Sequence, residues 1–153
     1  MYDGLSRVAG RGVPFSVQIN SMGVGDNFMA SSDYYRNKAR VLDTGAQVWE
    51  WYGDYSSHGK SLLIDQDLAA VGSYNLDMRS TYQDTELMLA IDSEKLNSMI
   101  RKEAETDKTY SKTMGPDGNY IQGENYVPKK LSTGKKIFYW TLRVLTVPLR
   151  KFL

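Results

Sequence analysis

The chain has 153 residues, of which 41% are hydrophobic and 24% are charged, the proportions of an ordinary globular protein with enough residues for one core. It contains no cysteine, which excludes disulfides and thiolate chemistry, and no run approaching the roughly 20 apolar residues of a membrane-spanning helix. The net charge of +1 conceals an asymmetry, because residues 1–124 carry 12 basic and 18 acidic side chains, whereas residues 125–153 carry seven basic and no acidic ones.

The first fifty residues alternate segments that are typical of helices and strands. Gly10 and Gly12 end a first helix, and Gly45 ends a second one that Ser31 or Ser32 can cap. The expected elements are a helix end at 5–9, a strand at 13–19, a helix from 31 or 32 to 43, and a strand at 46–51.

The rest of the chain continues this alternation. The nearly all-apolar segment 86–91 is expected to be a central strand, Ser93 begins a helix, and the glycines and prolines of 112–132 predict a loop or linker. The expected elements are strands at 60–65, 68–72 and 86–91, a turn at 66–67, a helix at 93–106 and a helical tail from 134. Strands alternating with helices indicate an α/β domain.

One stretch of 18 residues, 58–75, carries most of the chemical information in the chain. It follows the pattern H-x-K-x4-D-x6-G-S-x-N with every fixed position filled, and it holds the single histidine of the chain. Such a match arises by chance in a chain of this length with a probability on the order of 10⁻⁶. A histidine, a lysine, a serine and an asparagine brought together by two short strands suit attack on a phosphodiester.

The pattern resembles the HKD signature of the phospholipase D superfamily. Residues 75–80 and 85–89 (Asn-Leu-Asp-Met-Arg-Ser and Thr-Glu-Leu-Met-Leu) resemble its bacterial cardiolipin synthase branch, where an acidic residue, Arg-Ser and a later glutamate follow Gly-Ser-x-Asn. Residues 12–21 and 39–48 are similar to strand and helix-to-strand segments of the family, so the resemblance covers roughly residues 5–92. It implies an α/β fold with a mixed sheet flanked by helices, from which the first helix and strand of the repeat are missing.

The resemblance, together with the composition of the later residues, divides the chain into a phospholipase D-like domain at 1–111, a loop or linker at 112–133 and a basic amphipathic tail at 134–153. The reaction of the family needs two motifs, because one histidine attacks while another protonates the leaving oxygen. The second motif therefore has to come from a homodimer mate or from the other half of a longer polypeptide. The short N-terminal segment favours the longer polypeptide, with this chain as its C-terminal half.

Five residues are the catalytic candidates. His58 is the expected nucleophile, because an imidazole attacks phosphorus and forms a covalent phosphohistidine. Lys60 is expected to face the same way and to bind a non-bridging phosphate oxygen. Asn75 can donate a hydrogen bond to the same phosphate, and Ser73 can hydrogen-bond either the phosphate or a neighbouring ligand. By resemblance, Glu86 accepts a hydrogen bond from the imidazole and so orients it.

Four further residues have supporting roles or roles that the sequence leaves open. The resemblance makes Asp65 structural, at the turn that follows it, and Gly72 permits close approach of the backbone. Asp77 and Arg79 either contact a lipid headgroup or pair with each other. No metal or cofactor is expected, because the sequence has no group of histidine and carboxylate residues at metal-ligand spacing.

The tail combines apolar, aromatic and basic residues. Arg143 at its centre argues against a membrane span, whereas an interfacial helix on an anionic membrane, ended by Pro148, fits the composition. The alternative is a terminal helix packed on its own domain or on the other half of the protein. The membrane interpretation predicts peripheral attachment to the cell membrane, on a side that the sequence does not identify.

Three functional hypotheses follow. The first is cardiolipin synthase-like phosphatidyl transfer from a phosphatidylglycerol-like phospholipid, with water, glycerol or phosphatidylglycerol as the acceptor. The second is a single-motif homodimeric nuclease, against which the acidic balance of residues 1–124 argues, because such a surface repels nucleic acid. The third is a half-domain that has no activity without a second motif.

Overall fold

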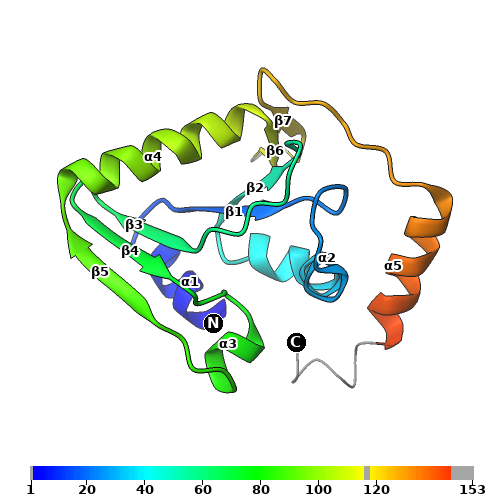
Figure 1. Cartoon of the computed structure of the whole chain (residues 1–153), viewed down its shortest axis with the longest axis horizontal. Coiled ribbons are helices and arrows are strands. Elements are labelled where there is room, and N and C mark those ends of the chain that lie inside the picture. Colours follow the sequence, from blue (N-terminus) through cyan, green and yellow to red (C-terminus); the bar gives the residue numbers. More distant parts are fainter. Residues whose placement is uncertain (1, 116–117, 146–153) are drawn as a thin grey trace.

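The computed structural model describes residues 2–115 and 118–145, and the backbone alone for residues 78 and 143. Figure 1 shows its elements, which are α1 (Tyr2–Gly10), β1 (Ser16–Asn20), α2 (Phe28–Leu42), β2 (Gln47–Trp51), β3 (Ser61–Ile64), β4 (Leu68–Gly72), α3 (Met78–Tyr82), β5 (Met88–Asp92), α4 (Glu94–Thr109), β6 (Ser111–Met114), β7 (Tyr120–Gln122) and α5 (Thr133–Leu145). The helix end predicted at Pro148 lies outside the described residues.

The first sheet has the order β1-β2-β6-β7. Parallel pairing of β1 with β2 places Asn20 beside Trp51 at the ends of the two strands, and β6 and β7 add antiparallel to β2. The prediction of a loop or linker at 112–133 is therefore wrong for these two strands. The buried residues of β6 are Ser111 and Thr113, so the sequence of this strand lacks the apolar alternation that predicts a strand. The strand forms because it pairs with β2.

The second sheet is antiparallel, in the order β3-β4-β5. The prediction that the apolar segment 86–91 is a central strand is wrong, because β5 is an edge strand among the described residues and β4 is the middle one. Leu89 of β5 is 59% exposed, whereas Ala69 of β4 is fully buried. A run of apolar residues indicates a strand, but it does not predict whether that strand lies in the middle or at the edge of its sheet.

The helix ends follow capping chemistry. Asn27 caps α2 by accepting a hydrogen bond from the backbone N–H of Ala30 at 3.0 Å. The predicted cap at Ser31 or Ser32 is wrong, since both residues lie inside the helix. The prediction that Ser93 begins a helix is confirmed, because Ser93 caps α4.

Helix α4 joins the two sheets. It packs against β4 of the second sheet and against β2 and β6 of the first, as Figure 1 shows. Its buried Asn97 donates hydrogen bonds to the backbone oxygens of Leu68 at 2.7 Å and Ile64 at 3.4 Å, on either side of the β3–β4 turn. A polar side chain thus fixes the helix against the second sheet.

A carboxylate is buried where α2 meets the first sheet. Glu50 of β2 is 2% exposed and accepts hydrogen bonds from Lys38 Nζ at 2.7 Å and Tyr34 Oη at 3.1 Å, while Lys112 Nζ lies 3.9 Å away. Burial, and then the charge of this carboxylate, raises the pKa of the nearby Tyr52 to about 12. The two lysines compensate a charge that would otherwise be costly to bury.

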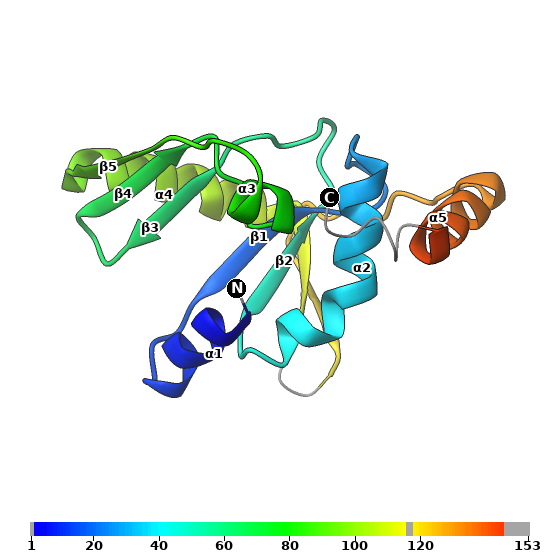
Figure 2. The same ribbon diagram turned by 90° about the horizontal axis from the view of Figure 1, so that it is seen from below.

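The predicted helical tail is confirmed as α5, which packs on α2. The rings of Phe28 and Phe138 meet at 5.6 Å, and Tyr139 is only 4% exposed. Figures 1 and 2 both place α5 beside α2 and away from the β3-β4-β5 sheet. Among the helices that the structure describes, none has the length and apolar character needed to cross a membrane.

Candidate active site

His58 lies on the exposed loop that joins β2 to β3. Asn20, the last residue of β1, holds this loop through both backbone polar groups of Ser57: its Nδ2 donates to the Ser57 oxygen at 2.8 Å, and its Oδ1 accepts from the Ser57 N–H at 2.9 Å. Asn20 Nδ2 also donates to Ser56 Oγ, which donates to Asp26. The backbone immediately before His58 is therefore fixed by the end of β1.

Asn20 is a functional candidate that the sequence did not single out. Its one available signal was a polar side chain at the point where a strand ends and a glycine-containing loop begins. That signal is common and does not predict the partner 37 residues away.

Lys60 connects the His58 loop to the second sheet. Its Nζ donates to the backbone oxygen of His58 at 2.8 Å, and its own backbone oxygen accepts from the Gly72 N–H at 3.2 Å. The β3–β4 pairing therefore continues one residue beyond β3, which brings Lys60 beside Gly72 and the serine that follows it. His58 and Lys60 both precede β3, so the prediction that they share a strand and therefore face the same way is wrong for the strand.

Ser73 and Glu86 form the tightest contact of the site. Ser73 Oγ donates to Glu86 Oε2 at 2.5 Å and accepts from the Leu87 N–H at 3.1 Å. The hydrogen bond from Ser73 is the main reason that the pKa of Glu86 lies below its usual value, and a hydrogen bond from Ser80 adds to this effect. The charge of Lys60 lowers the pKa of Glu86 as well, so Glu86 is an ionised carboxylate under the influence of the Lys60 ammonium.

Gly72 is required by the packing of the strands. A Cβ atom at this position would lie 2.0 Å from the backbone oxygen of Leu87 and 2.7 Å from the sulfur of Met88. The close approach that the sequence predicted is thus an approach of β4 to the segment before β5, and it sets the position of Ser73.

Asn75 and Asp77 precede the short helix α3, and Arg79 lies within it; the sequence patterns did not predict this helix. Asn75 Nδ2 donates to Ser80 Oγ at 3.4 Å, and Asp77 caps α3 by accepting from the Ser80 N–H at 2.7 Å. Arg79 forms an ion pair with Asp84 at 2.8 Å and not with Asp77. Headgroup contact by Asp77 and Arg79 stays a prediction.

The predicted contact between Glu86 and His58 is not made in this arrangement. Within the described residues the His58 imidazole has no hydrogen-bonded partner, and Glu86 accepts from Ser73 instead. Orientation of the imidazole by Glu86 therefore stays a prediction. Across residues 2–115 and 118–145, no three histidine or carboxylate side chains gather as a metal ion would require.

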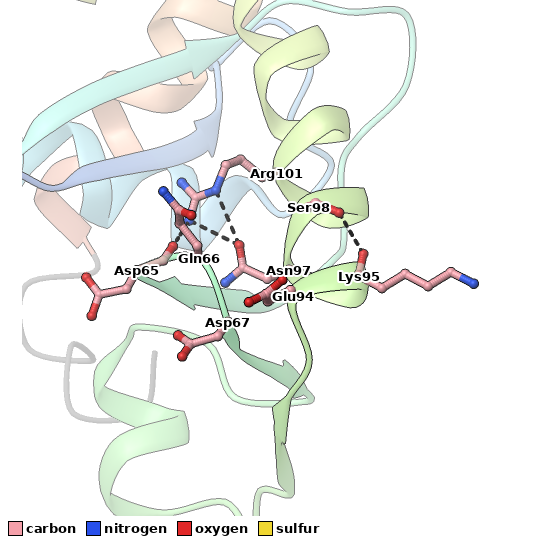
Figure 3. A pocket seen from close by; sticks show the side chains of 8 residues that line it. All are labelled: Asp65, Gln66, Asp67, Glu94, Lys95, Asn97, Ser98 and Arg101. Atoms are coloured by element: carbon pink, nitrogen blue, oxygen red, sulfur yellow. Dashed lines mark hydrogen bonds between the residues drawn. The ribbon is translucent and has the colours of Figure 1, made fainter.

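Asp65 lies at the opposite end of β3, roughly 16 Å from Lys60 at the rise of a β-strand. It adopts a positive φ of 48°, and its backbone oxygen accepts a hydrogen bond from Arg101 of α4 at 2.5 Å. Figure 3 shows this corner as an open hollow, in which Arg101 also reaches Asn97. The hollow belongs to the turn and does not include His58 or Lys60.

This fold is that of the phospholipase D family. The solved structure of the family member Nuc from Salmonella typhimurium superposes with a TM-score of 0.58 and 16% identity over 73% of this chain and 71% of that one. The resemblance to the superfamily and the mixed α/β fold with flanking helices, both predicted from the sequence, are confirmed.

Residues 1–108 match the family model described as "Cardiolipin synthase, PLD-like domain", and the chain belongs to this family. Cardiolipin synthase C of Escherichia coli K12 is 28% identical over 115 residues, which cover 64% of this chain and 24% of that protein. Cardiolipin synthase A of Proteus mirabilis is 34% identical over 93 residues, which cover 59% of this chain and 18% of that protein. The chain thus spans less than a quarter of the length of these relatives.

Proposed function

We propose that this chain supplies one of the two motifs of a phosphatidyl-transfer site that acts through a phosphohistidine. One observation carries the proposal: Lys60, Ser73 and Glu86, from three separate segments, converge beside the His58 loop in a chain of the cardiolipin synthase PLD-like family. The substrate class that fits the family is a phospholipid with an alcohol headgroup, such as phosphatidylglycerol.

The reaction has two displacements at phosphorus. In the first, an imidazole nitrogen of His58 forms a bond to phosphorus and the bond to the headgroup oxygen breaks, with a proton delivered to that oxygen by a second histidine. In the second, the hydroxyl oxygen of an acceptor attacks phosphorus, its proton passes to the same second histidine, and the nitrogen–phosphorus bond breaks. Transfer to phosphatidylglycerol gives cardiolipin, and transfer to water gives hydrolysis.

The neighbours of His58 have separate tasks. The Lys60 ammonium binds a non-bridging phosphate oxygen and stabilises the charge that develops there. Asn75 donates its amide to the phosphate. Glu86 turns toward His58 when substrate is bound and stabilises the imidazolium, and the hydrogen bond from Ser73 lowers the pKa of this carboxylate. Asp65 takes no part, because it lies at the far turn.

The second histidine comes from a partner, since this chain holds one histidine. A homodimer mate and the remainder of a longer polypeptide are both sources of a second motif. We expect that either of them faces the His58 loop, where the imidazole is exposed.

The test is product analysis by mass spectrometry after the full chain has been incubated with phosphatidylglycerol vesicles, alone and with a protein that carries a second motif. Cardiolipin or phosphatidic acid is expected in at least one of these reactions, and His58→Asn should abolish it. Lys60→Gln should lower it, whereas Lys102→Gln, which removes the same charge from the exposed surface of α4, should not. Cleavage of DNA with no lipid product would contradict the proposal in favour of the nuclease hypothesis.

A further inference from the structure

Helix α5 turns its apolar side toward solvent. Ile137, Trp140 and Val144 are 61%, 68% and 57% exposed, and their spacing of three and four residues places them on one face. Phe138 and Leu145, at 47% and 61% exposed, widen this face. Five large apolar side chains on one short helix form a patch of the kind that marks an interaction site.

The opposite side of α5 holds the helix to the domain. Tyr139 is buried, its ring packs on Phe28, and its hydroxyl donates to the backbone oxygen of Met22 at 3.3 Å. Phe138 takes part on both sides, because its half-exposed ring also meets Phe28 at 5.6 Å. The packing of α5 on α2 therefore rests on Tyr139 and Phe138, and it does not account for the exposed Ile137, Trp140, Val144 and Leu145. Burial within the described chain explains one side of the helix only.

The charged residues of α5 and of the segment that leads into it are all basic. Lys135 and Lys136 are exposed in the first turn of α5, and Lys130 is exposed just before it. The sequence of 125–153 contains seven basic and no acidic residues. A helix with a broad apolar face that includes tryptophan, bordered by lysines, matches an anionic bilayer surface, where apolar side chains enter the interface and ammonium groups meet lipid phosphates.

Helix α5 is also tied to the loop that carries His58. Lys129, four residues before the helix, donates to the backbone oxygen of Gly53 and pairs with Asp54 at 3.2 Å, both on that loop. On the other side, Tyr139 contacts Met22, two residues after the asparagine that clamps the loop. A surface that binds α5 therefore sits in a fixed relation to His58.

We infer that the outward face of α5, formed by Ile137, Phe138, Trp140, Val144 and Leu145, docks the protein peripherally on an anionic lipid bilayer and so sets the position of the His58 loop relative to that bilayer. The inference concerns binding. A chain that binds vesicles without transferring phosphatidyl groups would contradict the proposed function and leave the inference standing.

The experiment is cosedimentation of the full chain with vesicles of phosphatidylcholine alone and of phosphatidylcholine mixed with phosphatidylglycerol. Wild type should bind the mixed vesicles and lose binding as salt is raised. Binding should also shift the tryptophan emission to the blue, because Trp140 is far more exposed than Trp51, which is 4% exposed. Loss of that shift in Trp140→Phe would assign the signal to α5.

Paired variants separate the two components of binding. Ile137→Ser combined with Trp140→Ser should weaken partitioning by at least roughly tenfold through lost apolar burial. Lys135→Gln combined with Lys136→Gln should weaken partitioning by roughly 30-fold at low salt only. Met99→Ser on α4 is the matched control, because Met99 is exposed to the same 61% as Ile137 and its loss should leave binding unchanged.

Two results would overturn the inference. One is equal vesicle binding by wild type and the serine variants, with circular dichroism showing that all of them are folded. The other is absence of vesicle binding together with concentration-dependent self-association that the serine variants abolish, which would assign the face to a second copy of the chain.

Discussion

Replacing Asn20 with alanine tests the clamp before His58. The change removes two hydrogen bonds to the backbone of Ser57, of 2.8 and 2.9 Å, and one of 3.1 Å to Ser56 Oγ. Because Ser57 is exposed, water replaces the lost partners, and each bond contributes only about 0.5–1 kcal/mol. The ordered conformation of the loop therefore loses about 2 kcal/mol of free energy relative to disordered conformations of the same loop. This lowers the population of the ordered conformation by up to roughly 30-fold.

The assay has two readouts. Amide hydrogen exchange over residues 53–59 should accelerate, and the rate of phosphohistidine formation in a single turnover should fall by roughly 10- to 30-fold, with little change in KM because no phosphate-binding group is removed. Asn27→Ala is the matched control: it removes a cap hydrogen bond from α2, costs about 1 kcal/mol of stability, and should leave both readouts at their wild-type values. Wild-type exchange and rate in Asn20→Ala would refute the reasoning.

Three further substitutions probe the site and the fold. Gly72→Ala should lower the free energy of unfolding by about 3 kcal/mol in urea denaturation, since its Cβ would lie 2.0 Å from a backbone oxygen, whereas Gly4→Ala, with nothing within 4 Å, should not; equal effects would contradict the packing argument. Ser73→Ala should raise the pKa of Glu86 toward its ordinary value in an NMR titration. A folded-state pKa below the unfolded-state pKa stabilises the protein at pH values above the unfolded-state pKa, and this stabilisation is lost as the pH falls through the folded-state pKa. The stabilisation that Glu86 contributes should therefore be smaller in the variant. An unchanged titration midpoint of Glu86 would count against the hydrogen bond. Glu50→Gln should lower the free energy of unfolding by about 3 kcal/mol, because it leaves the charges of two lysines uncompensated. An unchanged urea midpoint would show that the buried carboxylate is dispensable for stability.

The parts of the fold that the sequence predicted are those with local signals. Ser93 caps a helix wherever an amphipathic stretch follows it, and Gly45 ends one through its φ of +87°. The motif residues were found because six fixed positions recur at set spacing, and the two short strands they bracket form as predicted. Such signals need no knowledge of what lies elsewhere in the chain.

The parts that the sequence missed depend on partners distant in the chain. Strand β6 buries Ser111 and Thr113 and exists through its pairing with β2. The sequence does not distinguish Asn27 as the cap of α2, because two serines stand at equally plausible positions a few residues later. Asn20 acquires its role only when Ser57 is brought beside it. These features arise from tertiary contacts, which override local propensity.

The most direct test of the central claim is to trap the covalent intermediate. The full chain with its second motif is mixed with phosphatidylglycerol, quenched within a single turnover in alkaline denaturant, where a phosphohistidine survives, and digested for mass spectrometry. The account predicts a phosphatidyl adduct on His58 that forms and decays during the turnover and is absent in His58→Asn. Product formation without any adduct on His58, or the same turnover by His58→Asn, would contradict it.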